Sequence, residues 1–297
     1  MNLEEVRDKV YFVEGMNSGK YPYSNSLLIE DDQVMLIDTG TGPEVVNEIA
    51  QEKKVNILIN SHGHEDHIGG NYLFPSATIC AHQFDAPAIR STEKLKELYD
   101  VTDSELEKEM DVFLEDMFSL RNSRVDMEFE DGKMFNLGNV KLEVLHTPGH
   151  SAGHCCFYIP KMKLIFLSDI DLSSFGPWYG CLDSNITDLI NSIHRIKSLD
   201  FETAISSHKG IIEGKEEVDE RLDKYLEKIY ERENMLWELL HEEKNLEEIV
   251  EEAIIYGSFP EPQGMYRLME KTMIIKHLGK LVEENKINRT HRGFTHT

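Results

Sequence analysis

Four side chains that commonly bind metal ions lie within six residues of one another in SHGHEDHIGG, residues 61–70. They are His62, His64, Asp66 and His67, and they directly follow VNILIN, an apolar run typical of a buried strand. Imidazole nitrogens and carboxylate oxygens are ligands that divalent metals such as zinc accept. Because four ligands in so tight a loop cannot all face one ion, the spacing favours two adjacent ions, with a His-rich surface loop as the alternative interpretation. The fold must therefore hold this loop at the end of a strand.

Three later strand-like segments each end in further potential ligands. HTPGHSAGH, residues 146–154, follows KLEVL; LIFLSD ends at Asp169; and AISSH ends at His208. Taken singly, a His or Asp at a strand end is more often a capping or hydrogen-bonding group. Because the ends of several strands meet at one edge of a sheet, these groups and the segment 61–70 together predict a shared metal site.

Strand-like and helical segments alternate along the chain. Short apolar runs with turn residues between them fill residues 10–89 and return at 127–166, and residues 91–118 carry apolar side chains at helical spacing. After His208 the chain is highly charged, and its apolar spacing predicts helices. They cover 216–240, 246–255 and 265–284. We expect an α+β domain over residues 1–214, with a helical insert at about 91–118, and a small all-α domain over residues 215–297.

Charge and composition exclude several classes of protein. With 31 Lys and Arg against 55 Asp and Glu, the formal net charge is −24, which repels phosphate backbones and anionic membranes at long range. The sequence has no run of 18 apolar residues, and its first residues, MNLEEVRDKV, lack the apolar stretch of a signal peptide. The four cysteines form no C-x-x-C pair. We therefore expect a cytoplasmic protein without a membrane-spanning helix.

The H-x-H-x-D-H motif followed by Gly69-Gly70 resembles the metallo-β-lactamase superfamily, over about residues 10–210. The resemblance implies a four-layer αβ/βα sandwich of two mixed sheets, with the metal ions at one edge. It implies that the ligands are His62, His64 and His150 for the first ion, Asp66, His67 and His208 for the second, and Asp169 as a bridge. Asp38, in LIDTG, matches a further family motif whose carboxylate orients the ligands. His146 and His154 are expected beside the ligands or in a structural role.

The resemblance also implies a reaction. Two divalent ions roughly 3.5–4 Å apart lower the pKa of a shared water, so that a bridging hydroxide attacks the substrate. Asp66 is then both a ligand and a relay for the proton that reaches the leaving group, and Asp169 is the second catalytic carboxylate. Some β-lactam-hydrolysing members have a metal-binding Cys where this chain has Asp169, so the resemblance favours a small ester, thioester, lactone or related substrate. Zinc is the first expectation for the two ions, and iron or manganese suit the same ligands.

The segment after Asp169, IDLSSFGPWYGCLDSN, leaves the predicted metal edge and is rich in Gly, Pro and aromatic residues. Phe175, Trp178 and Tyr179 are therefore candidates for a substrate pocket, with Tyr179 as a hydrogen-bond donor to a substrate carbonyl. The alternative is that these rings pack the loop onto the core. The insert at 91–118 is either a lid over the site or a homodimer interface.

The C-terminal residues resemble the small winged-helix-like appendage that some superfamily members carry. Its basic residues are Lys276, Lys280, Lys286, Arg289 and Arg292. They are the support for an alternative function, a metal-dependent nuclease or phosphodiesterase, although the acidic segment 216–252 makes nucleic acid a poorly matched partner. A diiron redox or binding member of the same superfamily is a further alternative. It is disfavoured because the diiron relatives have Glu where this chain has His64.

Overall fold

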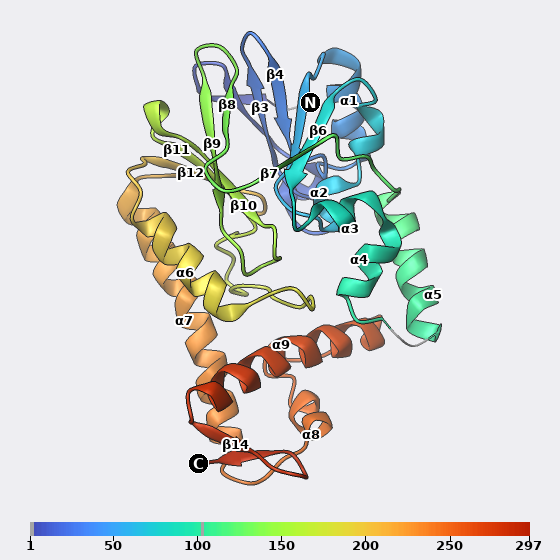
Figure 1. Cartoon of the computed structure of the whole chain (residues 1–297), viewed down its shortest axis with the longest axis vertical. Helices are drawn as coiled ribbons and strands as arrows, with labels where there is room; N and C mark the ends of the chain where they lie inside the picture. Colours follow the sequence, from blue (N-terminus) through green and yellow to red (C-terminus); the bar gives the residue numbers. More distant parts are fainter. Residues whose placement is uncertain (1–2, 102–103) are drawn as a thin grey trace.

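Two β-sheets face one another across an apolar core in the computed structural model, which describes residues 3–101 and 104–297 (Figure 1). The strands of the first sheet, in spatial order, are β1 (Leu3–Arg7), β2 (Val10–Val13), β3 (Ser26–Glu30), β4 (Val34–Ile37), β5 (Ile57–Asn60), β6 (Thr78–His82) and β7 (Met127–Phe129). The strands of the second sheet, in spatial order, are β13 (Gly210–Glu213), β12 (Thr203–Ser206), β11 (Leu164–Ser168), β10 (Cys155–Ile159), β9 (Lys141–His146) and β8 (Met134–Asn136). Both sheets mix parallel and antiparallel pairs.

Both faces of the first sheet are buried at its central strands β3, β4 and β5, which explains why those strands are mostly apolar along their length. In β4, Met35 and Ile37 belong to the core between the sheets, whereas Leu36 belongs to a second core on the outer face. Successive side chains of a strand point to opposite faces, so a strand covered on both sides needs an apolar residue at every position.

Helices cover the outer face of each sheet. The helices that do so are α1 (Pro43–Glu52) on the first sheet and α6 (Ile186–Lys197) and α7 (Lys215–Leu239) on the second. Val46 and Ile49 of α1 pack in the outer core of the first sheet, and Ile193 of α6 and Leu222 of α7 pack in that of the second. The resulting order of helix, sheet, sheet and helix confirms the predicted α+β sandwich.

The metal-binding residues predicted from the sequence gather at one edge because of the parallel strand pairs. β4 pairs in parallel with β5, and β11 pairs in parallel with β12, so their carboxyl ends point the same way within each sheet. Asp38 follows β4, His62 and His64 follow β5, Asp169 follows β11 and His208 follows β12. A four-residue helix, α2 (Glu65–Ile68), continues the loop after β5.

The helical insert is divided into short helices. These are α3 (Ala86–Arg90), α4 (Thr92–Leu98), α5 (Ser104–Val112) and a π-helix (Phe113–Met117). Part of the predicted helix, residues 102–103, lies outside the described residues. Short 3₁₀ turns occur at Met16–Gly19, Asn71–Leu73 and Pro160–Met162.

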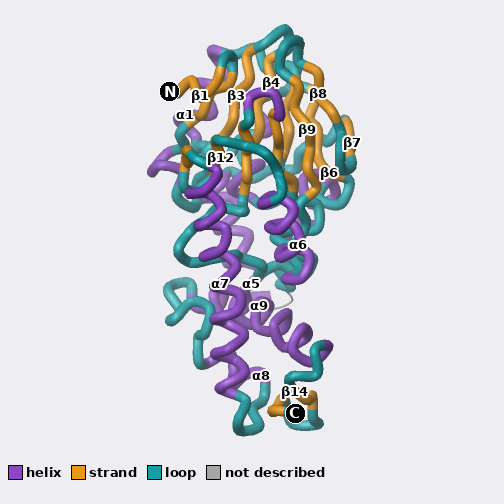
Figure 2. Tube along the Cα trace, turned by 90° about the vertical axis from the view of Figure 1, so that its left-hand side faces the viewer, coloured by secondary structure: helices purple, strands orange, loops and turns teal. Residues whose placement is uncertain are grey.

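The C-terminal extension is mainly helical and continues the outer core of the second sheet. After α7 come α8 (Leu246–Glu251), α9 (Gln263–Glu283) and a hairpin of β14 (Ile287–Arg289) and β15 (Phe294–His296). One continuous cluster of buried residues includes Leu167 of β11, Leu222 of α7 and Leu278 of α9. α9 crosses below the sandwich and contacts α5 at its start (Figures 1 and 2). The three predicted C-terminal helices are present, and the hairpin is an addition to them.

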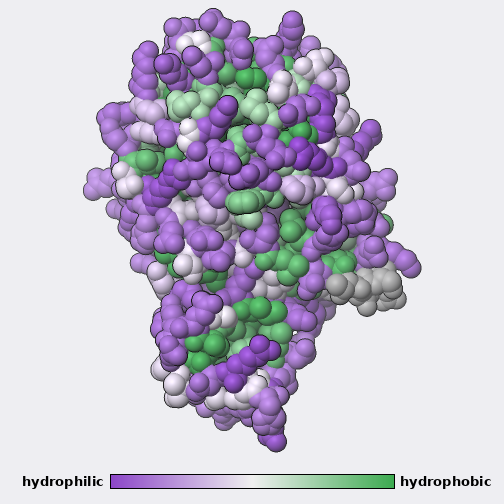
Figure 3. All heavy atoms as spheres, in the orientation of Figure 1, coloured by the Kyte–Doolittle hydropathy of each residue, from purple (hydrophilic) through white to green (hydrophobic). Residues whose placement is uncertain are grey.

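Hydrophilic residues cover most of the face drawn in Figure 3, and hydrophobic ones gather over the C-terminal helices. Throughout residues 3–101 and 104–297, every helix is too short or too polar to span a bilayer.

The continuous core predicts that the extension and the sandwich unfold together. Leu222→Ala removes a fully buried side chain from this core, so we expect it to lower the free energy of unfolding by about 2–5 kcal/mol. Met235→Ala, on an exposed position of the same helix, should change it by less than about 0.5 kcal/mol. Urea denaturation followed by circular dichroism measures both. Two separate transitions, or equal effects of the two substitutions, would contradict a shared core.

Candidate metal centre

Three imidazoles form the first ligand group. The ring nitrogens of His62, His64 and His150 lie within 4.8 Å of one another. His150 Nε2 is 3.3 Å from His62 Nε2 and 2.8 Å from His64 Nδ1. All three side chains are buried. The sequence placed the first two on one loop, and the fold brings His150 to them from the loop after β9.

Two imidazoles and two carboxylates form the second ligand group, which contains Asp66, His67, Asp169 and His208. Asp66 Oδ2 lies 3.6 Å from His67 Nε2 and 3.5 Å from His208 Nε2. The same two nitrogens lie 3.0 and 3.3 Å from Asp169 Oδ1. The structure therefore brings together all seven residues that the sequence singled out as ligands.

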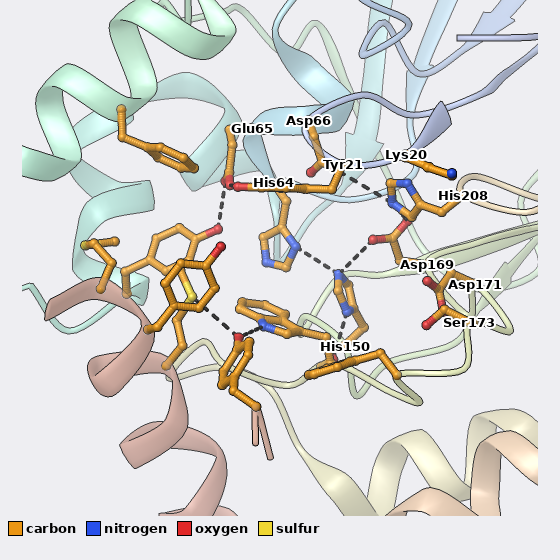
Figure 4. A pocket seen from close by; sticks show the side chains of 18 of the residues that line it. Lys20, Tyr21, His64, Glu65, Asp66, His150, Asp169, Asp171, Ser173 and His208 are labelled. Atoms are coloured by element: carbon orange, nitrogen blue, oxygen red, sulfur yellow. Dashed lines mark hydrogen bonds and ion pairs between the residues drawn. The ribbon is translucent and has the colours of Figure 1, made fainter. Parts of the chain in front are cut away.

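Asp169 lies between the two groups. Its Oδ1 atom faces His67 and His208, whereas its Oδ2 atom is 3.4 Å from His150 Nε2 and 3.9 Å from His62 Nε2. Figure 4 shows this carboxylate between His150 and His208, with Asp66 above it. A carboxylate so placed has one oxygen available to each group.

Unpaired buried atoms show that the residues fit metal ions. His67 Nε2 and Asp169 Oδ1 are buried and lie 3.0 Å apart, close enough for an ion pair. Among the described residues, however, neither atom makes a hydrogen bond. Leaving such atoms unpaired costs free energy, which bonding to a cation would remove. The donor atoms are imidazole nitrogens and carboxylate oxygens, so the two groups suit two divalent ions.

Burial and charge act in opposite directions on the histidines. Burial, followed by the neighbouring imidazoles, lowers the pKa of His62 and of His64 well below its ordinary value. Burial also opposes a charge on His208, but the carboxylates led by Asp169 raise the pKa of His208 to about 10. His67 shows the same balance, and its pKa is raised well above the ordinary value. Because a metal binds the unprotonated ring, loading the second group must release protons.

Asp38 orients the second ligand group. Its Oδ2 atom lies 2.9 Å from His67 Nδ1 and accepts a hydrogen bond from the Ser61 hydroxyl, and its Oδ1 atom accepts the Ser61 amide. Ser61 Oγ in turn lies 3.0 Å from His62 Nδ1. The fully buried carboxylate thus contacts both the loop after β5 and the ring of His67.

His154 lies beside the ligand groups. Its Nε2 atom accepts a hydrogen bond from the Asp169 amide, and its Nδ1 atom is 3.0 Å from the Thr147 carbonyl oxygen. His146 lies further away and stacks on His82, with ring centroids 4.0 Å apart.

Asp85 is a positioning residue that sequence reasoning missed. It accepts hydrogen bonds from the Gly63 amide, between two ligands of the first group, and from the Ser151 hydroxyl and Gly153 amide, in the loop that carries His150. One buried carboxylate therefore ties the two ligand loops together. The signal in the sequence was weak: Asp85 comes three residues after the end of a strand, and no recognisable ligand motif surrounds it.

A cavity of about 400 Å³ opens over both ligand groups. Phe175 and Trp178 line it, as expected from the sequence. Tyr179 is placed differently: it is fully buried, and its hydroxyl contacts His277 Nε2 at 2.6 Å and accepts a hydrogen bond from Arg232. Tyr179 therefore packs its loop onto the C-terminal helices, because those helices cover the side of the loop that faces away from the cavity.

Glu65 and two tyrosines form a further cluster at the cavity that the sequence did not reveal. The hydroxyls of Tyr21 and Tyr99 lie 3.1 and 2.7 Å from the Glu65 carboxylate and donate to it. Burial, with the adjacent charge of Asp66, raises the pKa of Glu65 to about 7. The partners come from segments more than thirty positions away, so no local pattern could predict the cluster.

Comparison with known proteins agrees with this geometry. The family model described as "Metallo-beta-lactamase superfamily" matches residues 20–208, which include all seven candidate ligands. The chain belongs to the metallo-β-lactamase superfamily. A superfamily protein from Thermus thermophilus, of solved structure, superposes with a TM-score of 0.71 over 98% of this chain and 100% of its own, at 21% identity, which supports the shared fold.

Two curated relatives of this superfamily member carry names of hydrolases. The human acyl-coenzyme A thioesterase MBLAC2 is 26% identical over 57% of this chain and 64% of its own length. The hydroxyacylglutathione hydrolase of Maricaulis maris is 25% identical over 59% of this chain and 57% of its own length. The matches thus span less than two thirds of either relative.

The hydrogen bonds of Asp85 predict a specific metal-binding defect. Asp85→Ala frees both ligand loops, so we expect metal affinity to fall about 10- to 100-fold. The control is Asp200→Ala, at a side chain that is 81% exposed and that pairs with Lys163 rather than with either ligand loop. Competition with a chromogenic chelator measures the affinity. Unchanged affinity in Asp85→Ala would show that the loops do not need this carboxylate.

Proposed function

We propose that this protein is a metal-dependent hydrolase that uses a dinuclear centre to cleave thioesters of small acids. The observation that carries the proposal is the placement of Asp169, one oxygen of which faces each ligand group. A carboxylate shared by two groups of imidazoles suits a pair of divalent ions better than a single ion. The names of the two relatives, a coenzyme A thioesterase and a glutathione-ester hydrolase, support a thioester over the lactone and other esters.

The seven candidate ligands form two sets, one for each ion. His62, His64 and His150 would hold one ion, Asp66, His67 and His208 the other, and Asp169 both. When bound, the ions supply Lewis acidity and lower the pKa of water to near neutrality. We propose zinc for both positions, although iron or manganese would suit the same donor atoms.

Asp66 and Asp169 are the catalytic carboxylates of this proposal. Asp66 lies on the second group, is 4% exposed and borders the cavity, so its carboxylate can take a proton from an attacking water and pass it to the leaving group. Asp169 lines the cavity and contacts both ligand groups, so its carboxylate can position the two sites relative to each other and to the substrate. The Asp169 amide donates a hydrogen bond to His154 Nε2, and the Tyr225 hydroxyl donates one to the Asp169 carbonyl oxygen.

The nuclease alternative loses support because much of the basic C-terminal stretch is engaged within the protein. Lys276 donates hydrogen bonds to the Leu182 and Ser184 carbonyl oxygens. Lys280 pairs with Glu233 and Glu284, and Lys286 also pairs with Glu284. The ion pairs offset the charges of Lys280 and Lys286, and the hydrogen bonds occupy donors of Lys276, so these three lysines are poorly available to a phosphate backbone.

A metal analysis combined with a substrate panel tests the proposal. The wild-type protein should hold about two equivalents of metal and hydrolyse acyl thioesters faster than lactones or phosphodiesters. Asp169→Ala should hold less than two equivalents and lose turnover, because both groups lose a ligand. His154→Ala, which removes a neighbouring ring, should keep the wild-type stoichiometry. Full metal content in Asp169→Ala, or a lost equivalent in His154→Ala, would contradict the ligand assignment, and a phosphodiester preference would contradict the substrate class.

A further inference from the structure

The cavity over the ligand groups has two chemically different sides. One side, which we call the apolar wall, is made of rings and thioethers from the insert, the loop after β11 and the C-terminal helices. The apolar wall consists of Tyr99, Trp178, Tyr256, Met265, Tyr266 and Met269. The other side, which we call the cationic rim, consists of Lys20 and Lys209.

The apolar wall begins at the first ligand group. The Trp178 ring lies 5.4 Å from that of His64 and 5.6 Å from that of His150, centroid to centroid. The polar atoms of three wall residues are already paired: Trp178 Nε1 donates to the Tyr256 hydroxyl, and the Tyr99 hydroxyl donates to Glu65. The wall therefore offers the cavity mainly carbon and sulfur atoms.

The C-terminal extension holds the wall in place. Arg232 of α7 donates hydrogen bonds to the Phe175 and Pro177 carbonyl oxygens, in the loop that carries Trp178. Tyr256 and Tyr266 pack edge to face, with centroids 5.2 Å apart. A wall fixed by such contacts is formed before a ligand arrives, so it can select ligands by shape and length.

The cationic rim begins at the second ligand group. Lys209 directly follows His208, and His208 Nδ1 lies 2.7 Å from the carbonyl oxygen of Gly19, the residue before Lys20. In Figure 4, Lys20 lies beside His208, on the opposite side of Asp169 from His64. Both lysines are exposed, and in the described part of the chain no carboxylate oxygen lies within 4.0 Å of either ammonium nitrogen. They are available to an anionic ligand in a protein of net charge −24.

We propose that the cavity sorts the two halves of one substrate: an apolar acyl group lies on the apolar wall, and an anionic thiol leaving group lies on the cationic rim. This inference rests on the proposed thioesterase function and adds the substrate class. A thioester whose carbonyl lies over Asp169 must extend one half toward Trp178 and the other toward His208. The departing thiolate gains negative charge, which favours the cationic side for the leaving group.

Of the carboxylates that also line the cavity, Asp66 and Asp169 belong to the second ligand group, and the other two, Glu65 and Asp171, do not cancel the rim. Glu65 accepts hydrogen bonds from two tyrosine hydroxyls, and Asp171 accepts one from the Ser173 amide. These donors offset part of their charge. The anion that the rim binds is a phosphate, as in a coenzyme A thiol, or a carboxylate, as in a glutathione thiol.

Acyl length tests the wall. Across coenzyme A thioesters from acetyl to octanoyl, we expect kcat/KM of the wild-type protein to rise roughly tenfold or more, since each buried methylene contributes about 0.8 kcal/mol in favourable cases. Tyr266→Ala and Met269→Ala should flatten this dependence. Met235→Ala, at an exposed position on α7, should keep it. A flat dependence in the wild-type protein, or an unchanged one in both wall variants, would overturn the acyl assignment.

The leaving group tests the rim. The ratio of kcat/KM for octanoyl-coenzyme A to that for the neutral octanoyl-N-acetylcysteamine should fall about fivefold to tenfold in the double variant Lys20→Gln, Lys209→Gln. The double variant Lys54→Gln, Lys161→Gln, at two exposed lysines outside the cavity, makes a matched change of charge and should leave the ratio unchanged. Octanoyl-glutathione, measured against the same neutral thioester, distinguishes the two anions. If its ratio also falls in the double variant, the rim binds carboxylates. If only the coenzyme A ratio falls, the rim binds phosphates. A ratio unchanged for both thiols would overturn the rim.

Binding without turnover separates this inference from the proposed function. The octyl thioether of coenzyme A cannot be hydrolysed, and calorimetry should show that it binds more tightly than the methyl thioether and more weakly to the wall variants. If these differences appear but no thioester is cleaved, the sorting stands and the proposed function fails. If thioesters are cleaved but the two thioethers bind equally, the proposed function stands and the sorting fails.

Discussion

The gathering of five imidazoles and two carboxylates, most of them buried, at one edge of a sandwich is the constraint on which the rest of this structure depends. Removing charged and polar groups from water costs several kcal/mol per group unless other groups compensate. Here the ligands face one another at 2.8–3.6 Å in several pairs, and buried atoms of His67 and Asp169 have no hydrogen-bond partner in the described residues. The arrangement is costly without cations and favourable with them. Its surroundings therefore have to keep the ligands in place for the ions to bind.

That support comes from three levels of structure. Parallel strand pairs bring the loops to the same edge. Buried carboxylates then fix the loops: Asp38 holds Ser61 and His67, and Asp85 joins the loops that carry His64 and His150. Finally, the carbonyl oxygen of Trp178 lies 2.9 Å from His150 Nδ1 and orients that ring. Since Arg232 holds the loop of Trp178, the C-terminal extension reaches the metal centre through two hydrogen-bonded contacts.

Local patterns made the candidate ligands and most of the sandwich recognisable in the sequence. H-x-H-x-D-H places four ligands within one loop, and continuous apolar runs identify strands covered on both faces. What the sequence could not supply depends on distant partners. Asp85 accepts a hydrogen bond from the amide of Gly153, 68 positions away. The Tyr179 side chain faces away from the cavity because its hydroxyl contacts His277, 98 positions away. The strands of β14 and β15 are three residues long and carry no clear alternation, so only the resemblance to a winged-helix-like appendage pointed to structure beyond the last helix.

The central claim is that two metal ions bind on either side of Asp169. Anomalous diffraction from crystals of the zinc-loaded protein, recorded above and below the zinc absorption edge, tests it most directly. We predict two zinc peaks, one among His62, His64 and His150 and one among Asp66, His67 and His208, with Asp169 bound to both. A single peak at saturating zinc, or two peaks of which neither contacts Asp169, would contradict the account.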